Sequence, residues 1–394
     1  MEGRAPVVLQ VLPGLGTGGA ERSTIDVAEA LTAAGGTAIV ASGGGPLVAE
    51  LVRAGATHVP LPAHSKNPWV MARNALRLAG LIDAYGVEIV HARSRAPAWS
   101  AWVAARRTGR PFVTTFHGTY NFGNPAKRWY NSIMTRGERV IANSGFIAAH
   151  IQANYRVDAA RIRVIPRGID LGRFDPDRVA SERVRRLAAE WALPEDAPVV
   201  MLPGRLARWK GQAVLIDAIA ALGHRDLCCL LVGAEQRRTG YRQELEARIS
   251  RLGLDPVVRI AGHCDDMPAA YLLADVVVSA STDPEAFGRV AVEAQAMGRP
   301  LIATAHGGAA ETVIDGETGW LVPPGDAESL AQAIDRALAL DDWMRQAMAR
   351  QAVTHARASY GRDLMCARTI AVYRELLTAG PGFAGGFAEA SDGP

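Results

Sequence analysis

The fold class follows from residues 7–20, whose sequence is VVLQVLPGLGTGGA. An apolar run with the length of one buried strand leads into a glycine-rich turn, and a stretch with helical period begins near Ala20. Comparable units of strand, loop and amphipathic helix recur along nearly the whole chain. This alternation predicts an α/β protein in which helices cover both faces of parallel sheets.

The predicted strands form two series, which indicates two domains. The first series lies near 7–12, 37–41, 87–91, 112–116, 139–142 and 162–165, and the second near 198–203, 227–233, 257–261, 276–279, 301–304 and 320–322. Segment 166–178 contains two prolines and two glycines and is typical of an interdomain linker. We therefore expect two tandem doubly wound, Rossmann-like domains, 1–170 and 171–380, that face each other across a cleft. A last helix near 362–377 and a disordered tail at 381–394 complete the prediction.

Composition limits the class of protein. The 394 residues are 49% hydrophobic and 21% charged, which is enough apolar content for two buried cores. No apolar run approaches the roughly 18 to 20 residues that span a bilayer, so we expect a cytoplasmic protein. The four cysteines lack the spacing of metal ligands, so neither a disulfide nor a cysteine zinc site is expected.

The net charge of +3 is unevenly distributed along the chain. Residues 1–170 hold 19 Lys and Arg against 10 Asp and Glu, whereas the remaining residues hold 24 against 30. A basic first half fits an anionic membrane surface, a phosphorylated substrate or simply a solvated basic face. Nucleic acid is disfavoured as a partner, because the basic residues are spread out and are not interleaved with aromatic residues in a known module.

Two segments of the first half mix cations with aromatic side chains, as peripheral membrane surfaces do. They are Lys127-Arg128-Trp129-Tyr130 and a predicted helix that bears Lys66, Trp69, Arg73 and Arg77. These segments predict a peripheral contact with the anionic inner face of the plasma membrane, and solvated helix faces are the alternative.

The glycines of the opening stretch, including Gly18 and Gly19, form a GxGxxG pattern between a strand and a helix. Such glycines let backbone N–H groups approach an anion at a helix N-terminus, which favours phosphate binding. A dinucleotide site would also need a carboxylate near the end of the second strand, and residues 40–44 contain none. The pattern therefore predicts phosphate binding and weakens an NAD site; a merely tight turn is the alternative.

Two further motifs follow predicted strands. His117-Gly118 follows strand 112–116, a position that in parallel sheets points to a ligand. Segment 204–211, GRLARWKG, places Arg205 and Lys210 five positions apart after strand 198–203. One planar guanidinium and one mobile ammonium suit a diphosphate that must be bound and neutralised. Arg208 fits a cationic surface loop better than its neighbours do.

Segment 283–300, DPEAFGRVAVEAQAMGRP, combines two carboxylates with a helix start. Pro284 stops the preceding segment, and a helix is expected to begin near Phe287 and to end at Gly298. Glu285 then lies in the loop and Glu293 about two turns inside the helix. Free N–H groups near Phe287 and Gly288 would bind an anion. This arrangement suits a ligand with hydroxyls at both ends and a phosphate between them, as in a sugar nucleotide.

Taken together, these motifs resemble those of glycosyltransferase family 4, the retaining transferases of the GT-B fold, over nearly the whole chain. The matching pieces are Gly18-Gly19-Ala20-Glu21, His117-Gly118, Gly204-Arg205 with Lys210-Gly211, Glu285-Ala286-Phe287-Gly288 through Glu293, and Gly307-Gly308-Ala309-Ala310-Glu311. Residues 90–99 are unusual for the family in carrying two arginines, Arg93 and Arg95, and they look similar to members placed near lipopolysaccharide core or cell-envelope glycan genes.

The resemblance implies a role for each candidate residue. Arg205 and Lys210 would bind the donor diphosphate, together with backbone at Phe287 and Gly288 and, from the first domain, Gly18 and Gly19. Glu285 would hold the transferred sugar, Glu293 the ribose, and His117 would contact the sugar near the reacting carbon. The family also implies retention of configuration, and a last helix that crosses back to the first domain.

The predicted activity is transfer of a hexose from a nucleotide-diphosphate sugar to a cell-envelope glycan or glycolipid acceptor. No cofactor and no metal are expected, because two cations and backbone amides would neutralise the leaving group. The string Asp175-Pro176-Asp177 lies in the linker and is typical of a turn. Three alternatives stay open: a sugar-nucleotide epimerase of related fold, an NAD-dependent oxidoreductase and a non-catalytic sugar-nucleotide-binding scaffold.

Overall fold

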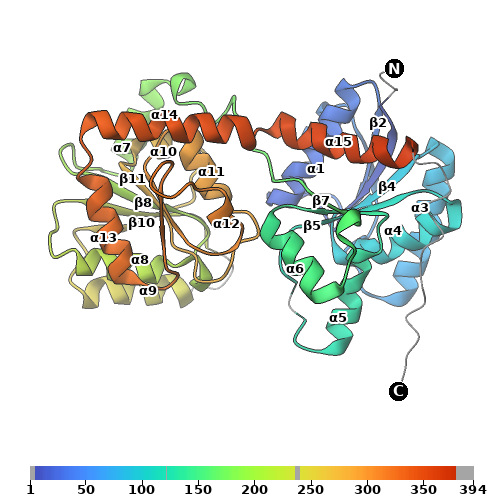
Figure 1. Cartoon of the computed structure of the whole chain (residues 1–394), viewed down its shortest axis with the longest axis horizontal. Helices are drawn as coiled ribbons and strands as arrows, with labels where there is room; N and C mark the ends of the chain where they lie inside the picture. The colour runs from blue at the N-terminus through green and yellow to red at the C-terminus, as the bar shows by residue number, and fades with distance from the viewer. Residues whose placement is uncertain (1–4, 121, 236–239, 379–394) are drawn as a thin grey trace. The chain divides into compact units, whose positions relative to one another are not determined.

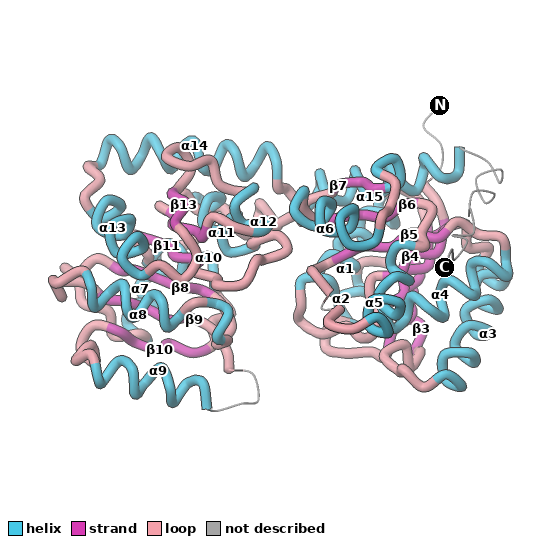
Figure 2. The backbone as a smooth tube through the Cα atoms, turned by 60° about the horizontal axis from the view of Figure 1, so that its bottom comes forward, coloured by secondary structure: helices cyan, strands magenta, loops and turns pink. Residues whose placement is uncertain are grey.

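The computed structural model describes residues 5–120, 122–235 and 240–378. It divides the chain into two compact units, Met1–Gly168 with Asp363–Pro394 as unit 1 and Ile169–Arg362 as unit 2. The tail predicted at 381–394 lies outside the described residues. Each unit is built on one sheet, whose strands lie side by side in Figure 2 with helices on both faces. None of the described helices combines the length and the apolar character that a bilayer-spanning segment needs.

Unit 1 contains a seven-stranded sheet in the order β3-β2-β1-β4-β5-β6-β7. Its strands are β1 (Val7–Val11), β2 (Thr37–Ser42), β3 (Thr57–Pro60), β4 (Ile89–Ala92), β5 (Phe112–Phe116), β6 (Arg139–Ala142) and β7 (Ile162–Val164), and every pairing between them is parallel. The sequence analysis missed β3. This edge strand is partly exposed along its whole length, so it carries no buried apolar run that would reveal it.

The helices of unit 1 cover both faces of its sheet (Figure 1). They are α1 (Gly19–Ala33), α2 (Val48–Arg53), α3 (Pro68–Tyr85), α4 (Arg95–Thr108), α5 (Pro125–Ser132), α6 (Gly145–Tyr155) and the last helix α15 (Arg362–Thr378). Val8 of β1, Leu31 of α1 and Tyr373 of α15 belong to one apolar core. The last helix is therefore part of the folding unit formed by the first half of the chain.

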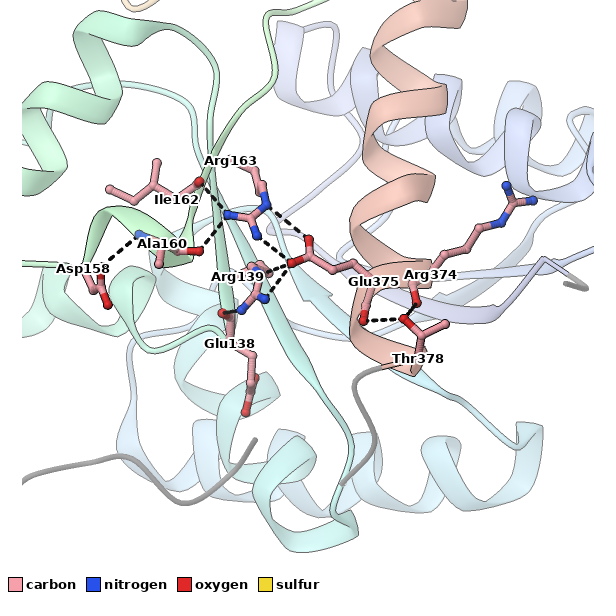
Figure 3. A network of polar contacts seen from close by, with 9 residues as sticks. All are labelled: Glu138, Arg139, Asp158, Ala160, Ile162, Arg163, Arg374, Glu375 and Thr378. Atoms are coloured by element: carbon pink, nitrogen blue, oxygen red, sulfur yellow. Dashed lines mark hydrogen bonds and ion pairs between the residues drawn. The ribbon is translucent and has the colours of Figure 1, made fainter. Parts of the chain in front are cut away.

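Polar contacts also fix α15 to unit 1 (Figure 3). Glu375 accepts hydrogen bonds from Arg139 Nη2 at 2.6 Å and from Arg163 Nη2 at 2.5 Å. The buried Tyr373 hydroxyl lies 2.6 Å from Nδ1 of His91 at β4. Buried polar groups are stable only when partnered, so this packing requires α15 in one register on the sheet.

Unit 2 contains a six-stranded sheet in the order β10-β9-β8-β11-β12-β13, and every pairing is parallel. Its strands are β8 (Val199–Pro203), β9 (Cys228–Val232), β10 (Val258–Gly262), β11 (Val276–Ser279), β12 (Leu301–Thr304) and β13 (Trp320–Val322). Its helices are α7 (Ser181–Glu190), α8 (Gln212–Ala221), α9 (Gly240–Arg251), α10 (Met267–Leu273), α11 (Arg289–Ala296), α12 (Gly307–Glu311), α13 (Ala327–Leu338) and α14 (Asp342–Ser359). Figure 1 shows α7, α10, α11 and α14 on one side of the sheet and α8, α9 and α13 on the other.

Successive residues of β8 belong to opposite cores, as the period of a strand requires. Met201 packs in the core beneath α10 and α11, whereas Val200 and Leu202 pack in the core beneath α8 and α13. The first of these cores also buries Ile169 and Phe174, which were predicted to lie in an interdomain linker. That prediction was too wide, because most of segment 166–178 packs as part of unit 2.

In each sheet, chain order reverses direction between two neighbouring strands. These neighbours are β1 and β4 in unit 1, and β8 and β11 in unit 2. The loops that leave the carboxyl ends of such neighbours run in opposite directions and leave a crevice, which is where open parallel sheets bind ligands. We therefore expect a ligand site at these loops in each unit.

Candidate functional site

Lys210 and Glu285 meet at the reversal point of unit 2. Lys210 lies in a short 3-10 turn (Arg208–Lys210) after β8, and Glu285 lies in the loop after β11. Lys210 Nζ is 2.8 Å from Glu285 Oε1, and only 13% and 11% of the two side chains are exposed. The structure thus brings together a cation and a carboxylate that the sequence placed in separate motifs.

Glu285 is held by a second contact and by a closely packed backbone. Ser281 donates a hydrogen bond to Glu285 Oε1 at 2.6 Å. The Gly308 N–H donates to the Glu285 carbonyl at 2.7 Å. At Gly307, with φ of 65°, an added Cβ would lie 2.6 Å from the Glu285 carbonyl oxygen. Glycine is therefore required where the first residue of α12 packs against the Glu285 loop.

Another glycine positions Lys210. Gly211 has a φ of 75°, and an added Cβ would overlap the carbonyl oxygen of Ala280 at the end of β11. The start of α8 can approach β11 this closely only without a side chain. Lys210 Nζ also lies 4.5 Å from the centre of the Trp209 ring, a cation–π contact.

The two other cations of the Gly204–Gly211 loop differ in their surroundings. Arg208 forms an ion pair with Glu244 and lies 5.2 Å from the centre of the Tyr241 ring. Arg205 is exposed, and its backbone carbonyl accepts a hydrogen bond from Gln212 Nε2 at 2.9 Å. Arg208 thus has surface partners of its own, as the sequence analysis expected of a cationic surface loop.

Glu293 is buried inside α11, with 8% of the residue exposed. Its Oε2 accepts a hydrogen bond from the Tyr271 hydroxyl at 2.9 Å, and its Oε1 accepts one from Arg289 Nη2 at 2.7 Å. Burial, together with the Glu293 charge, raises the pKa of Tyr271 well above its usual value, so Tyr271 stays a donor. Sequence reasoning missed both partners, although the i, i+4 spacing of Arg289 and Glu293 was a usable signal.

The helix after Glu285 begins two residues later than predicted, at Arg289 rather than near Phe287. Gly288 precedes it in the left-handed region, with φ of 84°. Phe287 is buried and packs on Tyr360, with ring centres 5.7 Å apart. The Phe287 side chain therefore anchors the loop in the core, and only its backbone is available for a ligand.

In unit 1, Gly18 lies between β1 and α1, and Gly19 is the first residue of α1, one position before the helix start expected near Ala20. Gly18 is the residue before the helix, and its backbone is extended, with φ of −77° and ψ of 167°. An added Cβ at Gly18 would collide with the carboxylate of Glu21. The glycine thus allows Glu21 to fold back over the start of α1.

His117 follows β5, and neither ring nitrogen has a hydrogen-bond partner among the described residues. Burial, followed by the charges of Arg167 and Arg93, lowers the pKa of His117 well below its usual value. The neutral imidazole can both donate and accept a hydrogen bond. His117 also lines a small pocket with Arg93, Asn143 and Arg167.

The two arginines of segment 90–99 have different environments. Arg93 is buried, and its Nε and Nη2 donate to Gln10 Oε1 of β1 at 2.9 and 2.5 Å. Arg95 begins α4, donates to Asn131 Oδ1 at 3.0 Å, and lies 4.3 Å from the centre of the Tyr120 ring. Arg93 therefore joins the two strands at the reversal point of unit 1, whereas Arg95 packs on the loop after β5.

Asp175 and Asp177 belong to a turn. Asp175 Oδ1 accepts a hydrogen bond from the Asp177 N–H at 3.1 Å, and the Asp175 carboxylate also forms ion pairs with Arg178 and Arg357. Within the described ranges, no group of three or more His, Cys, Asp and Glu side chains is placed to hold a metal ion.

Two doubly wound units, with a lysine–glutamate pair at a sheet reversal point, fit the class of the GT-B glycosyltransferases. Comparison with known families supports this class. The family "Glycosyltransferase Family 4" matches residues 17–173, and the family "Glycosyl transferases group 1" matches residues 184–355. The chain belongs to this family of nucleotide-sugar glycosyltransferases.

Individual relatives agree with this assignment. The D-inositol 3-phosphate glycosyltransferase of Actinosynnema mirum is 35% identical over 293 residues, 68% of each chain. A solved glycosyltransferase from Rickettsia africae is 40% identical, with a TM-score of 0.89 over 94% of this chain and 98% of that one. Anabaena HepE, solved in complex with UDP-glucose, is 26% identical, with a TM-score of 0.80 over 95% of this chain and 100% of that one.

Proposed function

We propose that the protein transfers a hexose from a uridine diphosphate sugar, with retention of configuration, to a glycan or glycolipid acceptor of the cell envelope. The observation that carries the proposal is the Lys210–Glu285 pair, formed by the loops that leave β8 and β11. In this scheme unit 2 binds the donor, and unit 1 binds the acceptor. UDP-glucose, the ligand in the structure of Anabaena HepE, is the first donor to test.

The scheme assigns each charge of the unit 2 site to one part of the donor. Breaking the sugar–phosphate bond leaves an oxocarbenium-like sugar and a diphosphate, so negative charge on the leaving group must be stabilised. Arg205 and Lys210, with the backbone at Phe287 and Gly288 and at Gly18 and Gly19, serve that purpose. Glu285 holds the transferred sugar, Glu293 the ribose hydroxyls, and His117 contacts the sugar near the reacting carbon.

A partly buried, already paired lysine suits this role. Lys210 loses little side-chain freedom on binding, because Glu285 and the Trp209 ring already restrict it. A carboxylate oxygen of Glu285 would accept from a sugar hydroxyl while Lys210 turns toward the phosphates. The acceptor oxygen attacks the anomeric carbon on the face from which the phosphate departs, and the leaving phosphate takes the acceptor proton, so the configuration is retained.

A surface of unit 1 supports a membrane-associated acceptor. Helix α3 exposes Trp69 and Leu76, 85% and 59% exposed, beside the exposed Arg73 and Arg77. Lys66 lies just before the helix, not within it as the sequence analysis expected, because Asn67 caps the helix N-terminus. Cations around exposed apolar side chains fit the interface of an anionic membrane, such as the inner face of the plasma membrane.

A phosphorylated polyol is the second acceptor to test, because of one of the relatives. The Actinosynnema mirum relative is a D-inositol 3-phosphate glycosyltransferase, and the excess of basic residues in 1–170 would also suit a phosphorylated polyol. Adding inositol 3-phosphate or membrane glycolipid to separate reactions distinguishes these acceptors, because only one should raise the rate of UDP release.

The proposal is tested first by ligand binding. A thermal-shift screen against UDP-, GDP- and ADP-sugars should show stabilisation by a UDP-hexose, about 2.7 kcal/mol at 100 times its dissociation constant. A product NMR spectrum should then show the anomeric configuration of the donor. Absence of any UDP-sugar shift would refute the donor assignment, and an inverted product would refute retention.

A further inference from the structure

A small polar pocket in unit 1 contains His117 together with side chains that have no role in the proposed transfer. The pocket has a volume of about 20 Å3 and lies at the carboxyl ends of β4 to β7. Its polar lining includes Arg93, Thr115, His117, Asn143 and Arg167. All of them belong to unit 1.

Asn143, directly after β6, is the residue in this pocket that the rest of the structure explains least. The residue is 1% exposed, yet within the described part of the chain neither its Oδ1 nor its Nδ2 has a hydrogen-bond partner. Both ring nitrogens of His117, in the same pocket, are also buried without one. Burying an amide unpaired destabilises a fold, so native proteins rarely retain such a group without a ligand or water to satisfy it.

The donors and acceptors of the pocket limit what it can bind. A side-chain amide offers two donors and one acceptor oxygen, and a neutral imidazole offers one donor and one acceptor. A phosphate dianion only accepts, so it would leave the Asn143 oxygen and the imidazole lone pair unpaired. A hydroxyl has one donor and two acceptor lone pairs, so it can accept a hydrogen bond from one of the two side chains and donate one to the other.

The size and charge of the pocket agree with a hydroxyl. A volume of about 20 Å3 holds roughly one water-sized group. Burial lowers the pKa of His117 well below its usual value, and the charges of Arg167 and Arg93 lower it further. The imidazole is therefore neutral near pH 7. Thr115 Oγ1 already contacts His91 Nε2 at 2.7 Å, and Arg93 already donates a hydrogen bond to Gln10. Asn143 and His117 are therefore the groups that a bound hydroxyl would contact.

We propose that Asn143, beside His117, binds a hydroxyl of the transferred sugar and so determines which sugar the enzyme accepts. The inference rests on the proposed function, in which His117 contacts that sugar. It adds a specificity-determining residue from unit 1 to the cations and carboxylates of unit 2.

The test compares UDP-glucose with its 2-, 3-, 4- and 6-deoxy analogues, using wild-type protein and Asn143→Ala. In the wild type, one analogue should lower kcat/KM for UDP release by about tenfold, the usual effect of one lost hydrogen bond. Asn143→Ala should lower kcat/KM for UDP-glucose about tenfold, and removing the same hydroxyl from the donor should lower kcat/KM of this variant no further. The other three analogues should lower kcat/KM by the same factor in Asn143→Ala as in the wild type. Independent effects at all four positions, or wild-type kcat/KM in Asn143→Ala, would overturn the proposal.

A matched control separates recognition from folding. Asn74 of α3 is also a buried asparagine of unit 1, but its Nδ2 already donates to the Pro62 carbonyl at 3.1 Å. Asn74→Ala should lower the melting temperature without coupling to any deoxy position. If Asn143→Ala does not fold, the isosteric Asn143→Asp provides the second variant, and it should couple to the same hydroxyl.

The same data separate failure of this inference from failure of the proposed function. If wild-type protein releases no UDP from UDP-glucose with any acceptor, the proposed donor is wrong, and the role proposed for Asn143 is wrong as well. If wild-type protein turns over and Asn143→Ala shows no coupling, only the role of Asn143 is wrong.

Discussion

Lys210 Nζ lies 2.8 Å from Glu285 Oε1, although 75 residues separate the two in the chain. Each residue lies in the loop that follows the carboxyl end of one of two adjacent strands, β8 and β11. The chain order of the sheet reverses between these two strands. The pair neutralises both charges when no donor is bound. A diphosphate can compete for the ammonium and leave the carboxylate free for sugar hydroxyls.

Replacing Lys210 with alanine should lower kcat/KM for transfer by tenfold to a few hundredfold. A charge-assisted hydrogen bond contributes roughly 1.5 to 3 kcal/mol, and this one would act mainly on the leaving group in the transition state. Steady-state UDP release measures the effect. Arg208→Ala is the matched control, because Arg208 lies in the same loop but pairs with Glu244 at the surface. Equal losses in the two variants would contradict the assignment.

The lowered pKa of His117 should make the stability of unit 1 depend on pH. Burial and the charges of Arg167 and Arg93 lower its folded-state pKa, so below about pH 6.5 the unfolded chain binds a proton that the native protein does not. The free energy of unfolding should therefore fall as the pH drops below about 6.5, and it should be insensitive to this group above that value. His91 contributes in the same direction, since burial and Arg93 lower its pKa as well.

Urea unfolding at pH 8, 7, 6 and 5 measures this dependence. His117→Gln should reduce the slope below pH 6.5 by up to about 1.4 kcal/mol per pH unit, and should leave the difference between pH 8 and 7 unchanged. An identical acid slope in wild type and His117→Gln would show that His117 is protonated in the native protein.

Tyr373 should be important for the stability of unit 1. Its hydroxyl is 2.6 Å from His91 Nδ1, and both residues are fully buried. Tyr373→Phe leaves the imidazole nitrogen unpaired in the core, which should cost about 1 to 3 kcal/mol of unfolding free energy. Tyr85→Phe, at an exposed position of α3, is the control and should be neutral. Equal unfolding free energies for the two variants would mean that the His91 contact contributes nothing.

The basic and aromatic face of α3 predicts binding to anionic vesicles. Each arginine near such a surface contributes about 1 kcal/mol, so replacing Arg73 and Arg77 with serine should weaken binding roughly tenfold or more. Trp69→Ala should weaken it further, whereas Trp343→Ala, on an exposed face of unit 2, should not. Flotation with phosphatidylserine vesicles measures this binding. Binding that does not depend on anionic lipid would remove the membrane proposal.

Most of the fold could be predicted from the sequence, because buried parallel strands are continuous apolar runs between helical segments. Strand β3 escaped detection because an exposed edge strand lacks that pattern. The sequence also placed Lys210 and Glu285 after strands. It did not indicate that they form an ion pair, since strand order, and not sequence distance, brings β8 beside β11.

The residues that sequence analysis missed have partners far away in the chain. Tyr271 reaches Glu293 only because α10 and α11 lie on the same face of the unit 2 sheet. The pocket around Asn143 exists because four strands and α15 converge there. An isolated asparagine after a strand carries no motif, and only its buried, unpartnered amide distinguishes it.

The most direct test of the central claim is kcat/KM for hexose transfer in Glu285→Gln. The substitution keeps the shape of the side chain but removes the charge that holds Lys210 and accepts from Ser281. We predict a loss of about a hundredfold or more in kcat/KM, with a melting temperature close to that of the wild type. Wild-type kcat/KM in Glu285→Gln would contradict the proposed donor site.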